Sequence, residues 1–223
     1  MYYIPVKKMT KVAPSILDVD PLKINEKVQF LDIAGADYIH IDVMDGNYVP
    51  NKSFGPQIIK SLKKITSKIL DVHLMIKPVQ PFIREFIDSG SDIISFHPEA
   101  DNETEEIIKT INSSNVKSGI ALHPNIKIAE IEYLLGEIDQ IIVMTVIPGF
   151  GGQKFIMSQL KKIKELYNLR NQKKYNFEIS VDGGINNSTA KMCIDHGVDI
   201  LAVGSYLLTK NEYEYKNLIQ SIR

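Results

Sequence analysis

Two short stretches of the chain place histidine and aspartate inside runs that otherwise resemble buried strands. In YIHIDVMDGNYVP, His40 and Asp42 stand two residues apart, and in LDVHLM, His73 falls at the same depth of the next strand-like run. Side chains two residues apart on a strand leave the same face, so His40 and Asp42 could reach one ion. A lone His-x-Asp pair is weak evidence, because a hydrogen-bonded structural pair has the same pattern.

A second aspartate strengthens the case for an ion site. Asp182 ends a later strand-like run in SVDGG. Two imidazoles and two carboxylates that converge form a ligand set suited to zinc or another divalent transition ion. The structural alternatives are a packed histidine at His73 and a helix cap at Asp182 for a helix starting near Asn187, but neither explains buried acidity on strands.

Glycine turns follow three successive strand-like runs near the C-terminal end of the chain. They occur in VIPGFGGQKF (146–155), in VDGGINN and in AVGSYLL. Backbone N–H groups in such a loop, at a helix N-terminus, can hold a phosphate without any lysine. Each turn alone is ordinary, but the three together favour a phosphorylated substrate.

Short apolar runs rich in β-branched residues alternate with amphipathic segments of helical period along the whole chain. The strand-like runs cover residues 12–17, 37–44, 68–76, 92–97, 117–122, 140–146, 177–184 and 200–205. Eight strand–helix units predict a parallel sheet with right-handed crossovers, closed into an α/β (β/α)8 barrel, also called a TIM barrel. An open doubly wound sheet is the competing fold, but APSILD lacks the glycine-rich dinucleotide turn expected after its first strand.

In a barrel of this kind the chemistry sits at the C-terminal ends of the strands, and the loops after strands seven and eight commonly hold phosphate. Polar residues do gather at or just past the ends of the runs: Ser15, His40, Asp42, Asp45, His73, His97, Asp182 and Ser205. Met44, Met75 and Met144 also fall near strand ends, where they could form a soft, water-poor wall. Asp45 begins a DG turn, so we expect it to shape the loop that follows.

Composition limits the remaining possibilities. The 26 basic and 27 acidic residues nearly cancel, which argues against nucleic acid or a membrane surface as the partner and favours a small molecule. The single Cys193 suits a reducing compartment and is expected to be a core thiol. No signal-peptide pattern or long apolar run occurs, so we expect a cytoplasmic protein. Residues 1–223 are expected to form one domain, with residues 1–10 a short N-terminal extension.

Taken in order along the chain, the motifs resemble those of the ribulose-phosphate 3-epimerase family. The most specific pieces are HIDVMDGNYVPN, LDVHLMI, VMTVIPGFGGQKF and SVDGGIN, and the similarity runs from VAPSIL to LAVGSYLL. The resemblance implies an isomerase of the pentose phosphate pathway that interconverts D-ribulose 5-phosphate and D-xylulose 5-phosphate through a cis-enediolate.

The resemblance also implies roles for particular residues. His40, Asp42, His73 and Asp182 would bind one divalent ion, Zn²⁺ or Fe²⁺ before Mn²⁺ or Co²⁺, and Asp42 and Asp182 would also be the acid/base pair. Substrate contacts would come from Ser15, His73, Gly149, Phe150, Gly151, Gly152, Asp182, Gly183, Gly184, Gly204 and Ser205. Members of the family are expected to assemble as homo-oligomers, either dimers or hexamers.

Three other functions compete with this interpretation. FHPEA is similar to the related allulose-6-phosphate 3-epimerases, whereas VDGG and Gly55 fit the ribulose-phosphate enzymes better. A non-catalytic sugar-phosphate sensor would not need both Asp42 and Asp182. A barrel decarboxylase or synthase usually has a lysine at a strand end, and Lys77 lies just beyond its strand.

Overall fold

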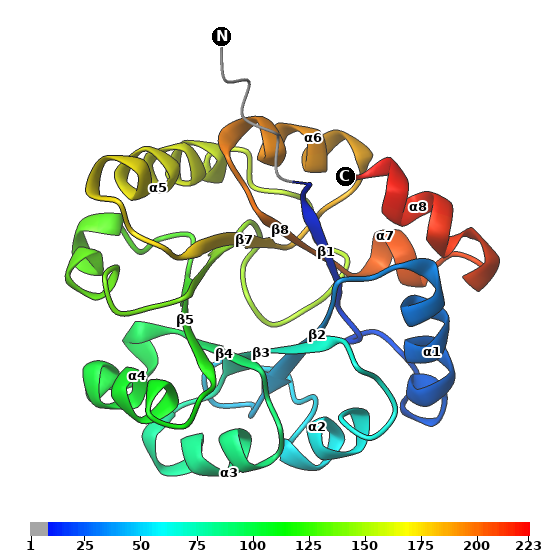
Figure 1. Ribbon diagram of the computed structural model, residues 1–223, viewed down its shortest axis with the longest axis horizontal. Coiled ribbons are helices and arrows are strands. Elements are labelled where there is room, and N and C mark those ends of the chain that lie inside the picture. The colour runs from blue at the N-terminus through cyan, green and yellow to red at the C-terminus, as the bar shows by residue number, and fades with distance from the viewer. Residues whose placement is uncertain (1–8) are drawn as a thin grey trace, which may run out of the picture.

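Eight parallel strands, each hydrogen-bonded to two neighbours, surround the centre of the molecule (Figure 1). The computed structural model describes residues 9–223. The strands are β1 (Lys11–Pro14), β2 (Tyr38–Met44), β3 (Ile69–Met75), β4 (Ile93–Phe96), β5 (Lys117–Leu122), β6 (Gln140–Met144), β7 (Glu178–Asp182) and β8 (Ile200–Val203). The sheet closes between β1 and β2, where the Asp37 amide donates to Val12 O at 3.0 Å and the Ile16 amide to His40 O at 3.1 Å. The prediction of a (β/α)8 barrel is confirmed.

Helices form an outer ring around the strands (Figure 1). The α-helices are α1 (Ile24–Ala34), α2 (Pro56–Leu62), α3 (Ile83–Asp88), α4 (Thr104–Asn112), α5 (Gln159–Lys173), α6 (Asn187–His196), α7 (Ser205–Leu208) and α8 (Tyr215–Ser221). Short 3₁₀ helices are η1 (Pro21–Lys23), η2 (Gln80–Phe82), η3 (Pro98–Ala100), η4 (Ile128–Glu130), η5 (Glu132–Leu134) and η6 (Glu212–Glu214). Gly35 ends α1 in the left-handed conformation at φ 90°.

The crossover from β5 to β6 departs from the predicted strand–helix repeat. It consists of the 3₁₀ helices η4 and η5 and contains no α-helix. Ile128, Ile131 and Leu134 are buried at a spacing of three residues, the spacing at which side chains of a 3₁₀ helix lie above one another. This segment therefore covers the barrel with a three-residue repeat, whereas an α-helix there would need apolar residues at 3.6-residue spacing.

The interior of the barrel is layered, because alternate residues of each strand point inward. A first apolar group of Ala13, Tyr38, Ile69 and Ile200 lies near the strand starts. A buried polar layer follows, made by His40, Asp71, Ser95, Gln140 and Ser180. Asp42 and His73 come one inward position further along their strands and are paired across the β2–β3 ladder. On β2 and β3, polar side chains therefore continue toward the strand ends, where the chemistry was predicted.

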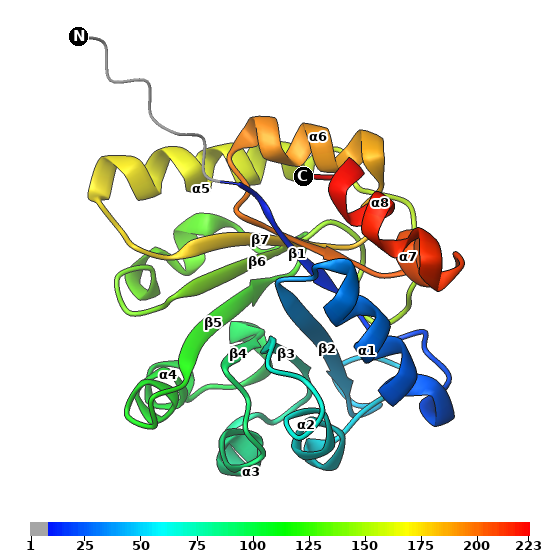
Figure 2. The same cartoon turned by 45° about the vertical axis from the view of Figure 1, so that its right-hand side comes forward.

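The chain closes on itself outside the barrel as well. Helix α8 packs beside α1, as Figure 2 shows, and buries Tyr215 completely. Cys193 is a buried free thiol on α6, as predicted, and burial raises its pKa to about 12. Of the predicted N-terminal extension, residues 1–8 lie outside the described residues, and only Met9 and Thr10 precede β1. No helix within residues 9–223 is long and apolar enough to cross a membrane.

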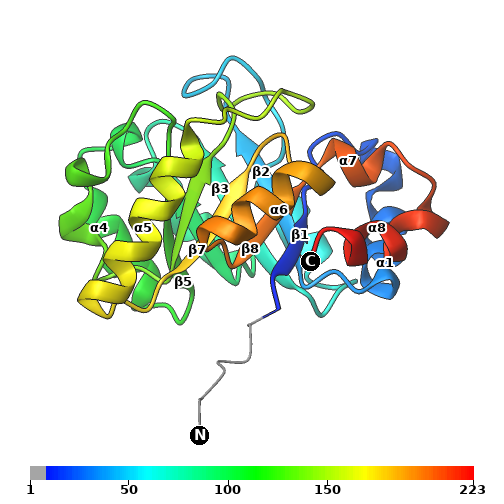
Figure 3. The ribbon, with the colours of Figure 1, turned by 90° about the horizontal axis from the view of Figure 1, so that it is seen from above.

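Two long loops project from the same end of the barrel, one after β2 and one after β6 (Figure 3). They touch each other, since Asn51 Nδ2 donates to Gly149 O at 2.9 Å. Asp45 shapes the first loop as expected: it accepts hydrogen bonds from the backbone amides of Asn47, Tyr48 and Lys77 at 2.7, 2.9 and 2.8 Å. The two loops form the rim of the site described next.

Candidate active site

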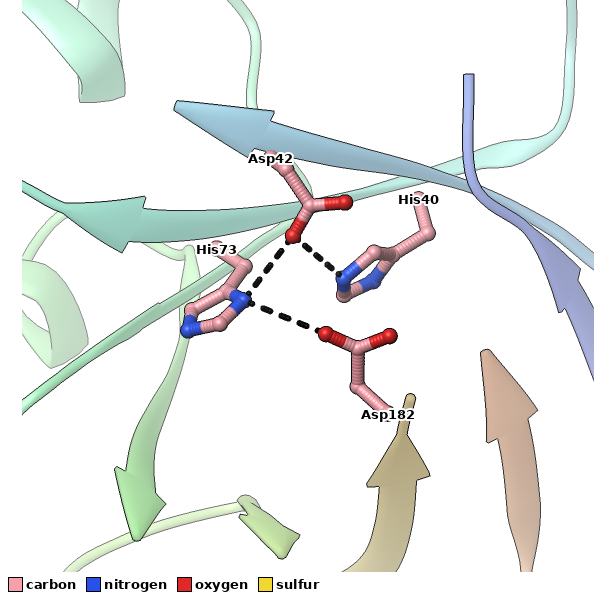
Figure 4. Close-up of side chains that lie close together, drawn as sticks. All are labelled: His40, Asp42, His73 and Asp182. Carbon is pink, nitrogen blue, oxygen red and sulfur yellow. Dashed lines mark hydrogen bonds and ion pairs between the residues drawn. The ribbon is translucent and has the colours of Figure 1, made fainter. Parts of the chain in front are cut away.

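Four side chains from three strands meet at the carboxyl end of the barrel (Figure 4). His40 and Asp42 come from β2, His73 from β3 and Asp182 from the end of β7. Each offers one nitrogen or oxygen atom, and these four atoms all lie within 4.8 Å of one another. The sequence prediction that these four residues converge is therefore matched by the geometry, and we call them the His/Asp cluster.

Asp42 is the hub of the His/Asp cluster. Its Oδ1 lies 3.0 Å from His73 Nδ1 and 3.3 Å from His40 Nε2. Its Oδ2 accepts a hydrogen bond from Ser15 Oγ at 2.7 Å. His73 Nδ1 also faces Asp182 Oδ2 at 3.9 Å. Asp182 is the more open of the two acids, with 16% of its side chain exposed against 4% for Asp42.

The two aspartates are driven toward opposite charge states. Burial alone would raise the pKa of Asp42, but His40 and His73 hold that pKa well below its usual range. Burial, followed by the charge of Asp42, raises the pKa of Asp182 to about 6. Although burial opposes it, the carboxylates of Asp42 and Asp71 raise the pKa of His40 well above its usual value. Two carboxylates with separated pKa values are the pattern expected of an acid and a base in one site.

Asp71 is the cross-strand neighbour of His40 and contacts its ring. The sequence analysis did not predict this role. Its Oδ2 lies 2.8 Å from His40 Nδ1, and its Oδ1 accepts from Gln140 Nε2 at 2.8 Å. All three side chains are essentially inaccessible to solvent. A carboxylate on one ring nitrogen fixes the tautomer and leaves the other nitrogen free to bind a ligand. The signal was present in LDVHLM, where Asp71 stands two residues before His73 on the same inward face.

His97 approaches His73 from the side. Their Nε2 atoms are 3.0 Å apart, and both rings are completely buried. Burial lowers the pKa of His97 to about 4, so its ring is neutral near pH 7. His97, one of the polar residues predicted at strand ends, thus contacts a member of the His/Asp cluster directly.

The donor set fits a divalent metal ion. His40 Nε2 is buried and makes no well-directed hydrogen bond within the described residues, while its partner nitrogen is held by Asp71. An imidazole nitrogen kept free in this way, beside a second imidazole and two carboxylates, is what zinc or iron(II) binds. The alternative in which Asp182 caps the next helix is wrong, because Asn186 caps α6 by accepting from the amides of Ser188 and Thr189.

A pocket with an empty volume of about 560 Å³ adjoins the His/Asp cluster on the side of β6, β7 and β8. Asp42 and Asp182 form one part of its wall and the predicted glycine turns another. The predicted substrate contacts that line it are Ser15, Gly149, Phe150, Gly151, Gly152, Asp182, Gly183, Gly184, Gly204 and Ser205. His73 is not part of this wall, because it lies behind Asp42 and Asp182. Met44, Met75 and Met144 line the same pocket, as their strand-end positions suggested.

One detail of the glycine prediction is wrong. The turn after β6 does not run directly into a helix N-terminus, because α5 begins only at Gln159. The intervening loop returns to its own strand, where the Ile156 amide donates to Thr145 O at 2.7 Å. Gln153 Nε2 donates to the carbonyl oxygens of Ile147 and Phe150 at 2.6 and 2.8 Å and braces the loop internally. Any anion in this pocket would meet turn amides of the loop and not the first turn of α5.

The closed parallel barrel, with acidic and imidazole side chains buried at its mouth beside a pocket of glycine turns, defines a (β/α)8-barrel enzyme. Comparison with known proteins supplies the family. Residues 11–208 match the sequence model of the ribulose-phosphate 3 epimerase family, and the chain belongs to that family. It is therefore an isomerase.

Curated relatives are similar over nearly the whole length of this chain. The chain is 42% identical to ribulose-phosphate 3-epimerase of Bacillus subtilis, covering 96% of this chain and 99% of the relative. It is 36% identical to ribulose-phosphate 3-epimerase of Escherichia coli K12, covering 97% and 96%. The chloroplastic enzyme of Arabidopsis thaliana is 40% identical, covering 91% of this chain and 73% of that protein.

Solved structures at low identity support the fold alone. A mutant tryptophan synthase α-subunit from Pyrococcus furiosus superposes with a TM-score of 0.70 at 13% identity, covering 96% of this chain and 98% of that one. A 3-hexulose-6-phosphate synthase superposes with a TM-score of 0.68 at 15% identity, again covering 96% and 98%.

Proposed function

We propose that this enzyme inverts C3 of D-ribulose 5-phosphate to give D-xylulose 5-phosphate, a reaction of the pentose phosphate pathway. The observation that carries the proposal is the pair Asp42 and Asp182, which face the same pocket from β2 and β7 with pKa values displaced in opposite directions. Strands β1 and β8 separate β2 from β7 around the barrel, so the two acids reach a bound sugar from different sides. Inversion needs that geometry, because the proton leaves one face of the carbon and another arrives on the opposite face.

The proton transfers follow from the charge states. In the ribulose to xylulose direction, ionised Asp42 removes the proton from C3, and the electron pair of the C–H bond moves into the C2 carbonyl to give a cis-enediolate. Asp182, which has the higher pKa of the two acids, then donates a proton to C3 from the other face as the carbonyl re-forms. The reverse reaction exchanges the two roles.

The same cluster would hold one divalent ion through His40 Nε2, His73 Nδ1 and one oxygen each of Asp42 and Asp182. Such an ion supplies positive charge beside the enediolate oxygens, and zinc or iron(II) suits the donor set best, with manganese or cobalt as further candidates. Asp71 keeps His40 Nε2 directed at that position, and Ser15 fixes the carboxylate of Asp42. Ordered ligands of this kind lose little entropy when they bind.

The phosphate would lie at the glycine turns that line the pocket. Gly149 and Gly152 adopt φ angles of 125° and 70°, and Gly183 and Gly184 of 114° and 66°, and turns of this kind can direct backbone amides toward an anion. Holding the phosphate there fixes C3 between the two acids. The expected homo-oligomer, a dimer or a hexamer, is tested by sedimentation of the purified protein.

Isotope exchange tests the reaction and its substrate together. In D₂O, the enzyme should place deuterium at C3 of D-ribulose 5-phosphate, observed as loss of the C3 proton signal in NMR, and form D-xylulose 5-phosphate. D-allulose 6-phosphate serves as the comparison substrate, since FHPEA resembles the enzymes that use it. Faster exchange with D-allulose 6-phosphate would replace the substrate in this proposal, and no exchange with either would leave only a binding protein.

A further inference from the structure

Asp18 lies on the loop after β1 and reaches across the barrel mouth to the loop after β6. A Cβ on Gly151 would lie 2.2 Å from Asp18 Oδ2 and 2.8 Å from Oδ1, so the carboxylate packs directly against this glycine. Strands β8 and β7 separate β1 from β6 in the sheet, and the turns after both strands line the same pocket as Asp18 and Gly151. Asp18 therefore lies beside the turns at which the phosphate is proposed to bind.

No described cation neutralises the charge of Asp18. The residue is exposed, and its side chain makes no hydrogen bond or ion pair within residues 9–223. The ionisable residues that line the pocket are Asp18, Asp42 and Asp182, and no lysine or arginine lines it in the described part of the chain. The reaction proposed above uses Asp42 and Asp182 and leaves Asp18 without a role.

Two opposing interactions act on a phosphate at these turns. Backbone amides of glycine turns attract an anion, whereas a carboxylate in contact with one of the turns repels it. The repulsion is larger for a phosphate dianion than for a singly charged group, because it scales with the product of the two charges. Since no described lysine or arginine lines the pocket, the protein offsets this repulsion only with neutral donors such as the turn amides.

We propose that Asp18 is a specificity-determining residue whose charge lowers the affinity of the pocket for a phosphate dianion. The proposal rests on the phosphate site of the proposed function. Substrate and product carry the same phosphate group, so Asp18 weakens the binding of both and leaves the equilibrium between them unchanged. Weaker binding of a group that does not react raises KM and shortens the time for which the product is retained.

Three variants separate the charge of Asp18 from its shape. Asp18→Asn removes the charge with almost no change in shape, and Asp18→Ala also removes any group that could donate a new hydrogen bond to phosphate. Both should fold as the parent does, because Asp18 is exposed and its side chain makes no hydrogen bond within residues 9–223. Asp195→Asn is the matched control, since it removes one negative charge from an exposed position at the end of α6 opposite the turn after β7.

Inorganic phosphate is the probe, and ³¹P NMR titration of the full-length protein measures its Kd. The Kd should fall about three- to tenfold in Asp18→Asn and Asp18→Ala and change by less than about twofold in Asp195→Asn. The gain should shrink in about 0.5 M NaCl, because salt screens exposed charges. Unchanged or weaker phosphate binding in Asp18→Ala would overturn the proposal, and so would a gain that salt does not reduce.

Steady-state kinetics gives the consequence for the sugar. KM for D-ribulose 5-phosphate should fall in Asp18→Asn and Asp18→Ala by about the same factor as the Kd of phosphate, and a higher KM in both would show that Asp18 helps to hold the substrate, contrary to the proposal. A parent that does not epimerise the sugar would refute the proposed function instead, and the phosphate affinities would still decide the role of Asp18. Absence of phosphate binding in the parent and in both Asp18 variants would overturn the proposal.

Discussion

The two sides of the barrel mouth differ in structure: one presents acidic and imidazole side chains, and the other presents glycine turns. The His/Asp cluster, three of whose four members come from β2 and β3, consists of acidic and imidazole side chains, and Asp71 supports His40 while Ser15 supports Asp42. On the side of β6, β7 and β8, the pocket wall includes three glycine turns, and Gln153 braces the loop that carries the first of them. The pKa of an ionisable side chain depends on neighbouring groups, whereas backbone amides carry fixed dipoles and need only the correct turn conformation. Changes on the first side should therefore affect chemistry and metal, and changes on the second should affect substrate affinity.

The largest expected effect is loss of either acid. Asp182→Asn and Asp42→Asn should each lower kcat by about 10²–10⁴, because an amide can neither remove nor deliver the proton at C3. Steady-state kinetics with D-ribulose 5-phosphate measures the loss, and circular dichroism checks the fold. Asp195→Asn, an exposed change on α6, is the control and should leave kcat unchanged. Near-parental turnover in either acid variant would remove the two-carboxylate mechanism.

The next largest effect is expected from substitution of Asp71, which contacts His40 of the His/Asp cluster. Asp71→Asn puts an amide against His40 Nδ1, and an amide hydrogen there favours the tautomer with hydrogen on Nε2, the nitrogen meant for the ion. Zinc affinity should fall about 10–100-fold, as measured by chelator competition. Zinc affinity equal to that of the parent would show that β2 alone orients His40. The side chains of the cluster would then not depend on buried partners, contrary to the comparison above.

The residues at the strand ends could be predicted from the sequence. The buried residues that contact and orient them were harder to predict. The period-two spacing of His40 and Asp42, together with the apolar runs, was enough to place the cluster at one end of the barrel. Asp71 and Gln140 contact each other although 69 residues separate them, and no local pattern indicates which inward-facing polar residues will meet across a closed barrel. The sequence prediction placed the glycine turn after β6 at a helix N-terminus, but loop contacts such as the Ile156 amide with Thr145 O separate that turn from α5.

The raised pKa of Asp182 predicts a pH dependence confined to the side-chain half of the site. A proton on Asp182 competes with the ion, so zinc affinity should fall as the pH drops below about 6. The part of this fall that is due to Asp182 should approach about tenfold per pH unit. The sign is fixed because the carboxyl must ionise to bind, and a raised pKa moves the loss into a higher pH range than an ordinary aspartate shows. Chelator competition between about pH 5 and 7.5 gives the slope. In Asp182→Asn the slope below about pH 6 should be shallower by about one, and an identical slope would assign the competing proton elsewhere.

The smallest expected effect tests the backbone half. A Cβ at Gly184 would lie 2.7 Å from the amide nitrogen of Phe155, and its φ of 66° disfavours any other residue, so Gly184→Ala should push the loop after β6 away from the turn after β7. We expect KM for D-ribulose 5-phosphate to rise about tenfold, equivalent to about 1.4 kcal/mol of lost binding, with zinc affinity unchanged. Gly35→Ala is the control, since Gly35 has φ 90° and open space around it at the end of α1, far from the loop of Phe155. A fall in zinc affinity in Gly184→Ala, with KM unchanged, would contradict this separation. It would show that a change in a glycine turn alters the metal site and leaves substrate affinity as it was.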